Sequence, residues 1–265
     1  MTEFLVATRA VAGRHFHQLL RLPEKLIGFT VMPVAMVVGL GILFGGSMRV
    51  PGGGDYGAYV SAGVVSSIAV SLAALTALGV VDDLQNGMFD RLRSLPVDRS
   101  ALLCGRIAVD ALPLGTAMVS VVVAARVLGW PVTAAPHAVL AAMGLEVLLA
   151  MGCACLGVVL GLTLRHAEAV TAVVPVCLLP LTFLSDAFVP PGGLPGPLQA
   201  VVAWNPVTAV NRTVRELLGD TPSVAAAAPW PAQHHGLVAV AFCLALLALG
   251  VPAATRVYDR DGRAR

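Results

Sequence analysis

Six long apolar runs, separated by charged or turn-forming segments, set the pattern of this chain of 265 residues. A helix needs about 20 mainly apolar residues to cross a bilayer, and each run is close to that length or longer. The runs, and so the predicted membrane spans, are residues 26–47, 56–81, 107–129, 138–164, 169–189 and 236–255. The pattern predicts an all-α, polytopic membrane protein in which residues 1–265 form a single transmembrane domain.

The composition agrees with this interpretation. Hydrophobic residues make up 57% of the chain and charged residues 12%, and the mean hydropathy is +0.85. A soluble domain carries about 25% charged residues, so this chain has too few to cover a surface in water. We therefore expect membrane lipid around the protein and no nucleic acid among its partners.

Basic residues are distributed unevenly between the segments that join the spans. If the N-terminus lies inside, 13 of the 17 Lys and Arg residues fall in inner segments and four in outer ones. Inner segments of membrane proteins are enriched in Lys and Arg, so both termini are predicted to be cytoplasmic in the plasma membrane. Aromatic residues that favour the interface agree, since five of them lie on the predicted outer side: Tyr56, Tyr59, Trp130, Trp204 and Trp230.

Residues 1–25 precede the first span and are predicted to form an amphipathic helix on the inner membrane surface. At helical spacing, one face gathers apolar side chains and the opposite face gathers polar ones. The apolar face consists of Phe4, Leu5, Val11, Ala12, Phe16 and Leu19, and the polar face of Arg14, His17 and Arg21. An ordinary solvated helix packed against the first span shows the same pattern, so both interpretations stay open.

Residues 190–234 form a long outer segment that proline and glycine divide. The stretch PPGGLPGP ends any helix after the fifth span, and the residues after it are typical of two short helices split at Asn205-Pro206. Asn205 suits the N-cap of the second helix, Pro206 its first turn and Gly219 its end. The pattern fits either a broken helix pair that enters the outer leaflet or a plain surface loop.

A charged block, residues 82–106, separates the second and third predicted spans. Four apolar side chains recur in it at helical spacing: Leu84, Met88, Leu92 and Leu95. They predict a short helix over residues 83–95 with one apolar stripe, ended by Pro96. A cytoplasmic helix with one apolar stripe among mixed charges suits docking into a groove of a partner protein.

Two stretches, in this order along a six-span chain, resemble the permease subunits of type-2 ATP-binding-cassette exporters. DDLQNGMFDRLRSLPVDRSALLCGR follows the second span and is similar to that family's acidic, Gly, Arg-Leu, Pro and Arg pattern, with Asp82-Asp83 where a glutamate is usual. NPVTAVNRTVREL, before the last span, resembles the family's Asn-Pro…Arg segment. The daunorubicin-resistance and polysaccharide-export permeases are of this kind, and the resemblance covers essentially the whole chain.

The resemblance implies that the charged block contains a coupling helix, which sits in a cleft of a separate ATPase subunit. Its contact residues would be Gly87, Met88, Phe89, Asp90, Arg91, Leu92 and Arg93. The protein would then be the permease subunit of an ATP-driven exporter that moves a hydrophobic or amphipathic drug, natural product or lipid-like molecule out of the cell. Six spans provide half of a transport pathway, so we expect a homodimer.

The chain itself lacks the phosphate-binding loop that an ATPase needs. That loop has the pattern GxxxxGK[ST], and the one lysine, Lys25 in RLPEKLIG, does not fit it. We therefore expect neither enzyme activity nor a cofactor in this chain, with ATP and Mg²⁺ bound by the partner ATPase.

Ionisable side chains inside a span are costly and are candidates for function. Glu146 in the fourth span and Arg126 near the outer end of the third can pair across this hairpin, either for structure or for gating or substrate binding. In the resembled family the second and fifth spans border the translocation route. Candidates for that route are Ser66, Ser67, Ser71, Phe183, Ser185 and Asn205, although hydroxyl residues also serve ordinary helix packing.

The main alternative is a membrane-embedded prenyltransferase or phosphotransferase. Asp82 and Asp83 at a span end resemble carboxylates that hold Mg²⁺ and a diphosphate, which requires a second acidic cluster on the same side. Asp259 and Asp261 are the available pair, and a solvated tail explains them more simply. The five cysteines have no CxxC spacing and no cluster of His or carboxylates, so no metal site is expected.

Overall fold

The computed structural model of the protein describes residues 23–48, 50, 53–87, 109, 112–130, 134–219 and 229–263. Every secondary-structure element within these ranges is a helix, which confirms the all-α prediction. The predicted interfacial helix, apart from its last residues, and most of the charged block lie outside the described residues, so both stay predictions.

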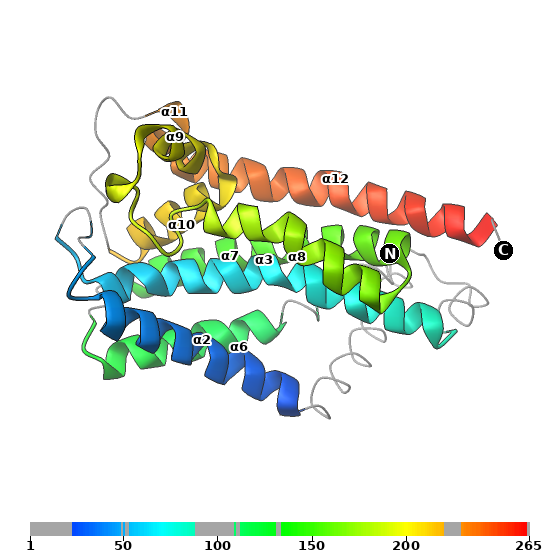
Figure 1. Cartoon of the computed structure of the whole chain (residues 1–265), viewed down its shortest axis with the longest axis horizontal. Helices are drawn as coiled ribbons and strands as arrows, with labels where there is room; N and C mark the ends of the chain where they lie inside the picture. The colour runs from blue at the N-terminus through cyan, green and yellow to red at the C-terminus, as the bar shows by residue number, and fades with distance from the viewer. Residues whose placement is uncertain are drawn as a thin grey trace.

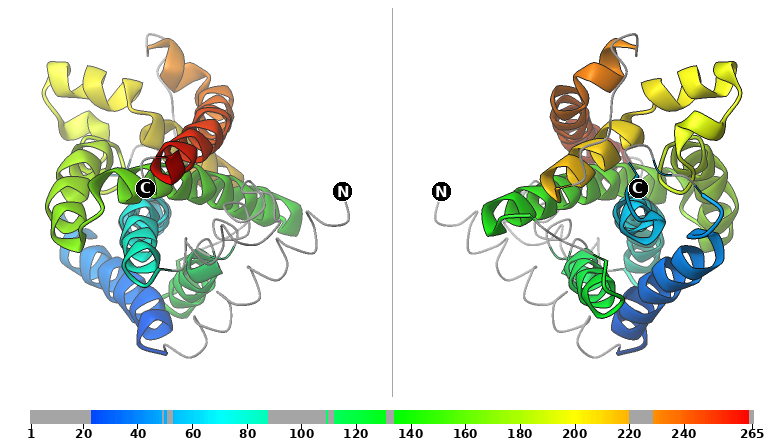
Figure 2. Two further views of the ribbon diagram at one scale, coloured as in Figure 1. Left: turned by 90° about the vertical axis from the view of Figure 1, so that its right-hand side faces the viewer. Right: turned by 90° about the vertical axis from the view of Figure 1, so that its left-hand side faces the viewer.

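The body of the molecule is a bundle of helices that run roughly along one axis (Figure 1). Its long members are α2 (Pro23–Phe44), α3 (Tyr56–Gln85), α7 (Pro136–Leu164) and α12 (His235–Arg263), and its shorter members are α6 (Leu112–Val127) and α8 (Ala167–Phe183). Seen from either end, α3 lies at the centre (Figure 2). It packs most extensively against α7 and also contacts α2, α6, α8 and α10 (Pro206–Leu217), while α12 packs on α7.

Length separates the helices of the bundle into two groups. Within the described ranges, α2, α3, α7 and α12 contain apolar stretches long enough to cross a membrane. α6 has 16 residues and α8 has 17. At about 1.5 Å per residue each is about 24–26 Å long, slightly less than a hydrocarbon core of about 30 Å. Four of the six predicted spans therefore coincide with helices long and apolar enough to cross a membrane, and the other two coincide with apolar helices that are shorter than expected.

The ends of α3 follow from two local features of the sequence. At its start, Asp55 Oδ1 accepts a hydrogen bond from the backbone N–H of Gly57 at 2.7 Å, a typical N-cap. At its end, Asn86 is the C-cap and Gly87 has φ +64°, a left-handed conformation that glycine tolerates best. The predicted helix over residues 83–95 therefore does not begin at 83, because residues 83–85 are the last turn of α3.

A group of short helices covers one end of the bundle (Figure 1). It consists of η1 (Pro191–Gly193), α9 (Gly196–Trp204), α10 and α11 (Trp230–Gln233). The break between α9 and α10 falls at Asn205-Pro206, and Gly219 after α10 has φ +97°, as the sequence predicts. α10 contacts α3, α7 and α12 and buries its valines, so this part of the segment belongs to the bundle and is not a plain surface loop.

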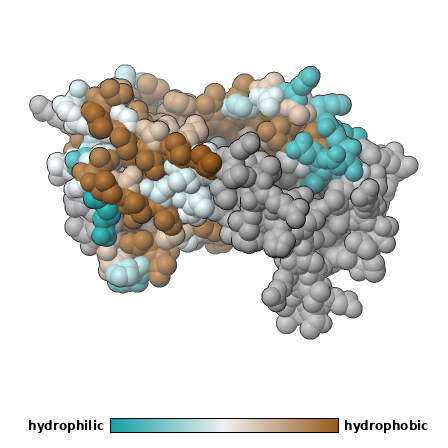
Figure 3. Space-filling view, turned by 90° about the horizontal axis from the view of Figure 1, so that it is seen from below, coloured by the Kyte–Doolittle hydropathy of each residue, from teal (hydrophilic) through white to brown (hydrophobic). Residues whose placement is uncertain are grey.

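Large apolar side chains point outward along the bundle. Exposed examples are Met32, Leu140, Val176 and Leu249, each about 68–73% exposed. Figure 3 shows the described surface on the side of α2 and α6, where hydrophobic residues dominate and hydrophilic ones gather mostly toward the ends. An apolar surface of this extent is unfavourable in water and suits contact with lipid.

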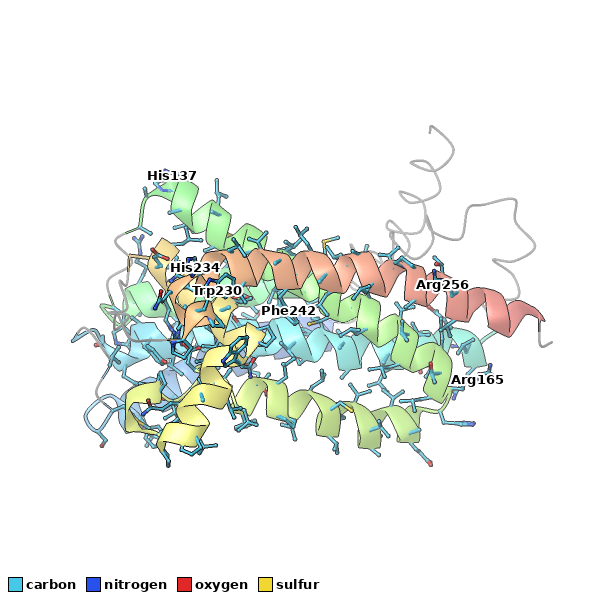
Figure 4. The ribbon with its side chains drawn as sticks, turned by 90° about the horizontal axis from the view of Figure 1, so that it is seen from above. His137, Arg165, Trp230, His234, Phe242 and Arg256 are labelled. Carbon is cyan, nitrogen blue, oxygen red and sulfur yellow. The ribbon has the colours of Figure 1, made fainter. Side chains whose placement is uncertain are left out.

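The two ends of the bundle differ in their side chains. Arg165 and Arg256 lie at one end, whereas His137, Trp230 and His234 lie at the other, with Phe242 between them on α12 (Figure 4). This polarity matches the predicted separation of basic inner residues from aromatic outer ones, while the orientation of the molecule in a membrane remains a prediction.

Candidate functional site

Asp186 is the centre of a buried polar cluster where α8, α10 and α3 meet. Its Oδ1 accepts a hydrogen bond from Asn211 Nδ2 at 3.0 Å, and its Oδ2 accepts one from Arg215 Nη1 at 2.9 Å. Arg212 Nε lies 3.3 Å from the same Oδ2. Asp186 and Arg215 are only 2% and 3% exposed. A buried carboxylate is stable only with such partners, and here both of its oxygens have one.

Arg215 joins this carboxylate to the start of α3. Its Nη2 donates to the backbone oxygen of Asp186 at 2.9 Å, and its Nε donates to the backbone oxygen of Tyr59 at 3.1 Å. Its Cζ atom lies 3.6 Å from the centroid of the Tyr59 ring, which adds a cation–π contact. The Tyr59 hydroxyl in turn donates to the Asp186 backbone oxygen at 2.8 Å. One network of opposite charges therefore fixes α10 and the turn after α8 to α3.

Asn205, a candidate for the translocation route, acts as a clamp between α8 and α10. Its Oδ1 accepts from the N–H of Val207 at 2.9 Å and so caps α10. Its Nδ2 donates to the backbone oxygens of Leu181 and Leu184 at 2.8 and 2.9 Å. These carbonyls belong to the end of α8, where no intrahelical partner is available. The Asn205 side chain thus supplies hydrogen-bond partners to backbone groups at the end of α8 and at the start of α10.

This clamp explains why α8 ends at Phe183 and not at residue 189, as the apolar run predicts. After Phe183 the chain turns, and the Tyr56 hydroxyl donates to the backbone oxygen of Phe188 at 2.8 Å. Asp186 therefore lies in a turn held by side chains of other helices and not inside a span. Apolar content alone cannot show where such long-range hydrogen bonds replace those of the helix.

Glu146 is buried within α7 and is bonded on one side only. Its side chain is 0% exposed, and its Oε1 accepts from the Oγ of Ser66 on α3 at 2.5 Å. Among the described residues, none forms a hydrogen bond with its Oε2. Glu146 lies ten residues into α7, or about 15 Å from the start of that helix. Glu146 is therefore a buried carboxylate, bonded on one oxygen, within a helix long and apolar enough to cross a membrane.

The predicted pair between Arg126 and Glu146 is not formed. Arg126 lies in the last turn of α6 and is exposed, whereas the one side-chain hydrogen bond that Glu146 forms with a described residue is to Ser66. The reason is the packing order, because α7 lies more extensively along α3 than along α6. The nearest polar side chain therefore comes from α3.

The serine candidates on α3 differ in their exposure. Ser66 is fully buried, Ser67 is half-buried and Ser71 is exposed. Ser67 and Ser71 donate to backbone oxygens of their own helix at 2.7 and 2.8 Å. Such bonds are common for hydroxyl residues in apolar helices, so they do not distinguish a role of these serines in helix packing from a role in transport.

The candidates beside the end of α8 also divide into a buried and an exposed one. Ser185 is buried, and its Oγ donates to the backbone oxygen of Thr182 at 2.5 Å. Phe183 is 67% exposed, with its ring centroid 5.6 Å from that of Phe188. Of the translocation-route candidates, Ser71 and Phe183 are thus exposed, and the others are buried or half-buried.

A cavity of about 500 Å³ lies between α3, α6, α7 and α10. We call it the Glu146 cavity because Glu146 is part of its wall. Most of the wall is apolar, from residues such as Ala62, Val65, Met118 and Met143. Arg215 also contributes to the wall, so the cavity borders the Asp186 cluster.

The structure describes only the first of the predicted ATPase contacts. Gly87 ends α3, and the other six, Met88 to Arg93, lie outside the described residues. Asp82 and Asp83, the carboxylates of the alternative enzyme hypothesis, lie in the last turns of α3. In the part of the chain that the structure describes, no three His, Cys, Asp or Glu side chains come together to hold a metal ion.

Comparison with known proteins decides between these hypotheses. The profile of the ABC-2 type transporter family matches residues 6–218, which include every bundle helix from α2 to α10 and the Asp186 cluster but not α12. The chain belongs to the ABC-2 type transporter family. It is 28% identical over 211 residues to the daunorubicin resistance ABC transporter permease protein DrrB1 of Streptomyces coeruleorubidus, an alignment that covers 80% of this chain and 72% of that protein.

The family gives this ABC-2 permease its general role. It is the transmembrane subunit of an ABC transporter, and the family implies an ABC ATPase subunit as its partner. Members of the family are transport subunits and are not themselves catalytic. This confirms the resemblance to permeases of type-2 ATP-binding-cassette exporters, which the charged block and the Asn-Pro segment indicate.

The Asp186 cluster of the ABC-2 permease is the feature that sequence reasoning missed. Asn211 and Arg215 are four residues apart on α10 and therefore share a face, which is a signal that the sequence contains. Asp186 stands alone, 25 residues before Asn211, and nothing local shows that it faces them. The pairing depends on the turn between α8 and α10, which only the tertiary structure reveals.

Proposed function

We propose that this ABC-2 permease is the membrane half of an ATP-driven exporter for hydrophobic or amphipathic molecules, such as drugs, natural products or lipid-like compounds. The observation that carries the proposal is the family match over residues 6–218, together with the similarity to a protein named for daunorubicin resistance. The mostly apolar wall of the Glu146 cavity supports a cargo of this kind over a sugar or an inorganic ion.

A separate ATPase supplies the energy through the charged block. Residues 87–93 dock into the ATPase, which binds ATP and Mg²⁺, and this permease holds neither. ATP binding by two ATPase subunits draws two permeases together and shifts their dimer between inward- and outward-facing states. Gly87, at the end of α3, connects the docking segment directly to the central helix of the bundle.

The permease works as a homodimer in the plasma membrane, with both termini cytoplasmic and six membrane crossings. Arg165 and Arg256 mark the cytoplasmic end of the bundle, because basic residues favour that side. Ser71 and Phe183 are exposed in one copy, and they face the translocation route where two copies meet.

Co-purification with the ATPase encoded beside this gene tests the proposal. The tagged permease and the ATPase are expressed together, extracted in detergent and assayed for ATP hydrolysis. Leu92→Asp places a charge on the apolar stripe of the docking segment and should remove the ATPase or uncouple its activity. Leu194→Asp is the matched control, because it makes the same change between η1 and α9, at the end of the bundle opposite Gly87.

The proposal holds if the wild-type permease and Leu194→Asp retain the ATPase and Leu92→Asp loses at least about tenfold in affinity for it, the effect of about 1.4 kcal/mol. It fails if no ATPase associates with the wild-type permease. If both variants retain the ATPase equally, residues 87–93 do not dock it, and the rest of the proposed function stands.

A further inference from the structure

We propose that the Glu146 cavity binds amphipathic organic cations, with the basic amine of the ligand placed against Glu146. This inference deepens the proposed function, on which it rests, by giving the chemical class of the cargo and a place for it within one subunit. It is carried by the shape of the cavity and by the one-sided bonding of Glu146.

The cavity has the size and surface of a site for a small amphipathic molecule. Its volume of about 500 Å³ falls in the range of about 300–1,000 Å³ that is typical of such sites. Alanine, valine and methionine from three helices form most of its wall: Ala58 and Ala62 of α3, Met118 and Val122 of α6, and Ala142 and Met143 of α7. Short and flexible apolar side chains accept bodies of varied shape.

The charged residues of the cavity wall differ in whether their charged groups are already paired within the protein. Arg215 is neutralised by Asp186 and bonded to Tyr59. Asp55 is exposed, and its Oδ1 caps α3. Glu146 is fully buried, and its Oε2 has no hydrogen-bond partner in the part of the chain that the structure describes. The wall of the cavity therefore contains one acidic side chain with an oxygen that no described residue bonds, and no unpaired positive charge among these residues.

An acidic group without a positively charged partner in the cavity wall favours a ligand with a positive charge. A carboxylate in apolar surroundings is costly unless a cation or a hydrogen-bond donor reaches it. A protonated amine supplies both a positive charge and a donor, and its apolar body fills the rest of the cavity. Ser66 donates to Oε1, which leaves Oε2 for this contact.

Direct binding to the purified permease tests the proposal without the ATPase. The permease is placed in nanodiscs of phosphatidylcholine and phosphatidylglycerol, which contain no primary amine. The probes are dansylcadaverine, a fluorescent amphipathic primary amine, and its N-acetyl derivative, which has the same body without the charge. Empty nanodiscs give the background from partition into lipid.

Glu146→Gln should weaken binding of dansylcadaverine about tenfold or more and change binding of the N-acetyl probe by less than about twofold, since only the amine uses the carboxylate. Glu168→Gln is the matched control, because Glu168 is exposed in the first turn of α8 and should leave both affinities unchanged. Ala58→Phe fills the cavity and should abolish binding of both probes. Each variant is checked for a single folded species by size-exclusion chromatography.

The proposal is overturned if the wild-type permease binds dansylcadaverine no better than empty nanodiscs do. It is also overturned if Glu146→Gln weakens both probes equally, which indicates a structural role, or if Ala58→Phe binds both as the wild type does. Should Glu146→Gln not fold, Ala58→Phe and the comparison of the two probes on the wild type still decide the outcome. Loss of ATPase association with intact probe binding refutes the proposed coupling and leaves this site standing.

Discussion

Two buried carboxylates of this ABC-2 permease have opposite surroundings. Asp186 has a partner on each oxygen, whereas Glu146 has Ser66 on one oxygen and no described residue bonded to the other. The first arrangement stabilises the junction of three helices, and the second leaves a group that a ligand can use. Glu146 is identifiable from sequence because an acidic residue inside an apolar run is conspicuous, but its partner is not.

Removing the carboxylate of Asp186 should destabilise the permease strongly. Asp186→Ala leaves Arg215 and Asn211 buried without their shared partner, and breaking such a pair costs about 3–5 kcal/mol. Thermal unfolding in detergent, followed by the reaction of newly exposed cysteines with a thiol-reactive dye, measures the loss. Cys153, Cys155 and Cys243 are buried in the folded protein and so report unfolding.

Arg212→Gln provides the comparison for this prediction. Arg212 makes a single contact with Asp186 at 3.3 Å and is more exposed than Arg215, so its loss should cost about 1 kcal/mol or less. If Asp186→Ala and Arg212→Gln lower the unfolding temperature equally, the cluster does not hold the three elements together.

At the scale of the elements, the contact between α3 and α7 organises the bundle. Gly157 and Gly161 of α7 lie against the backbone oxygens of Ala73 and Ala77 of α3, and a Cβ atom at either glycine would collide with them. Small residues four apart allow two membrane helices to approach closely. This approach brings Ser66 of α3 to Glu146, because the two helices run side by side along their length.

Adding one methyl group at these glycines should separate α3 from α7. Gly157→Ala and Gly161→Ala should each destabilise the permease by about 1–3 kcal/mol, the usual cost of overpacking. Gly144→Ala is a control on the same helix, because nothing lies within 4 Å of a Cβ atom there, and alanine favours the helix. The thermal unfolding assay applies again, and a loss at Gly144→Ala as large as at Gly161→Ala would contradict the role of the close approach.

At the scale of the whole molecule, the bundle has an apolar circumference and two chemically different ends. Exposed apolar residues run along α12, for example Leu237, Leu244 and Leu249, which are 52–73% exposed. Arg165 and Arg256 lie at one end, and His137 and His234 at the other. From these features we expect the end with Arg165 and Arg256 to face the cytoplasm, the end with His137 and His234 to face outward, and the short helix α8 to cross the membrane.

Single cysteines introduced at exposed positions test that topology after the native cysteines are replaced. A thiol reagent that cannot cross the membrane should label His137→Cys and His234→Cys on intact cells. It should label Arg165→Cys and Arg256→Cys only after permeabilisation, because basic ends face the cytoplasm. Gly192→Cys, beyond α8, should behave like His137→Cys if this helix of 17 residues crosses the membrane.

The outcomes of the labelling experiment are distinct. Reversed labelling of all positions overturns the orientation and leaves the six crossings intact. Labelling of Gly192→Cys from the same side as Arg165→Cys shows that α8 does not cross, and the six-span topology is then wrong.

The amino-acid sequence by itself determined the all-α class, the presence of the four long apolar helices, the split at Asn205-Pro206 and the family. These follow from apolar run length, from caps and from motif order, which are local properties of the chain. The early end of α8 and the partners of Asp186 and Glu146 were decided only by the tertiary structure. Each of these depends on side chains that come from other helices, such as Ser66 and Arg215. Hydrogen bonds and ion pairs between distant segments depend on which helices pack together. Hydrophobic periodicity predicts which residues of a helix are apolar, but it does not predict which other helix they pack against.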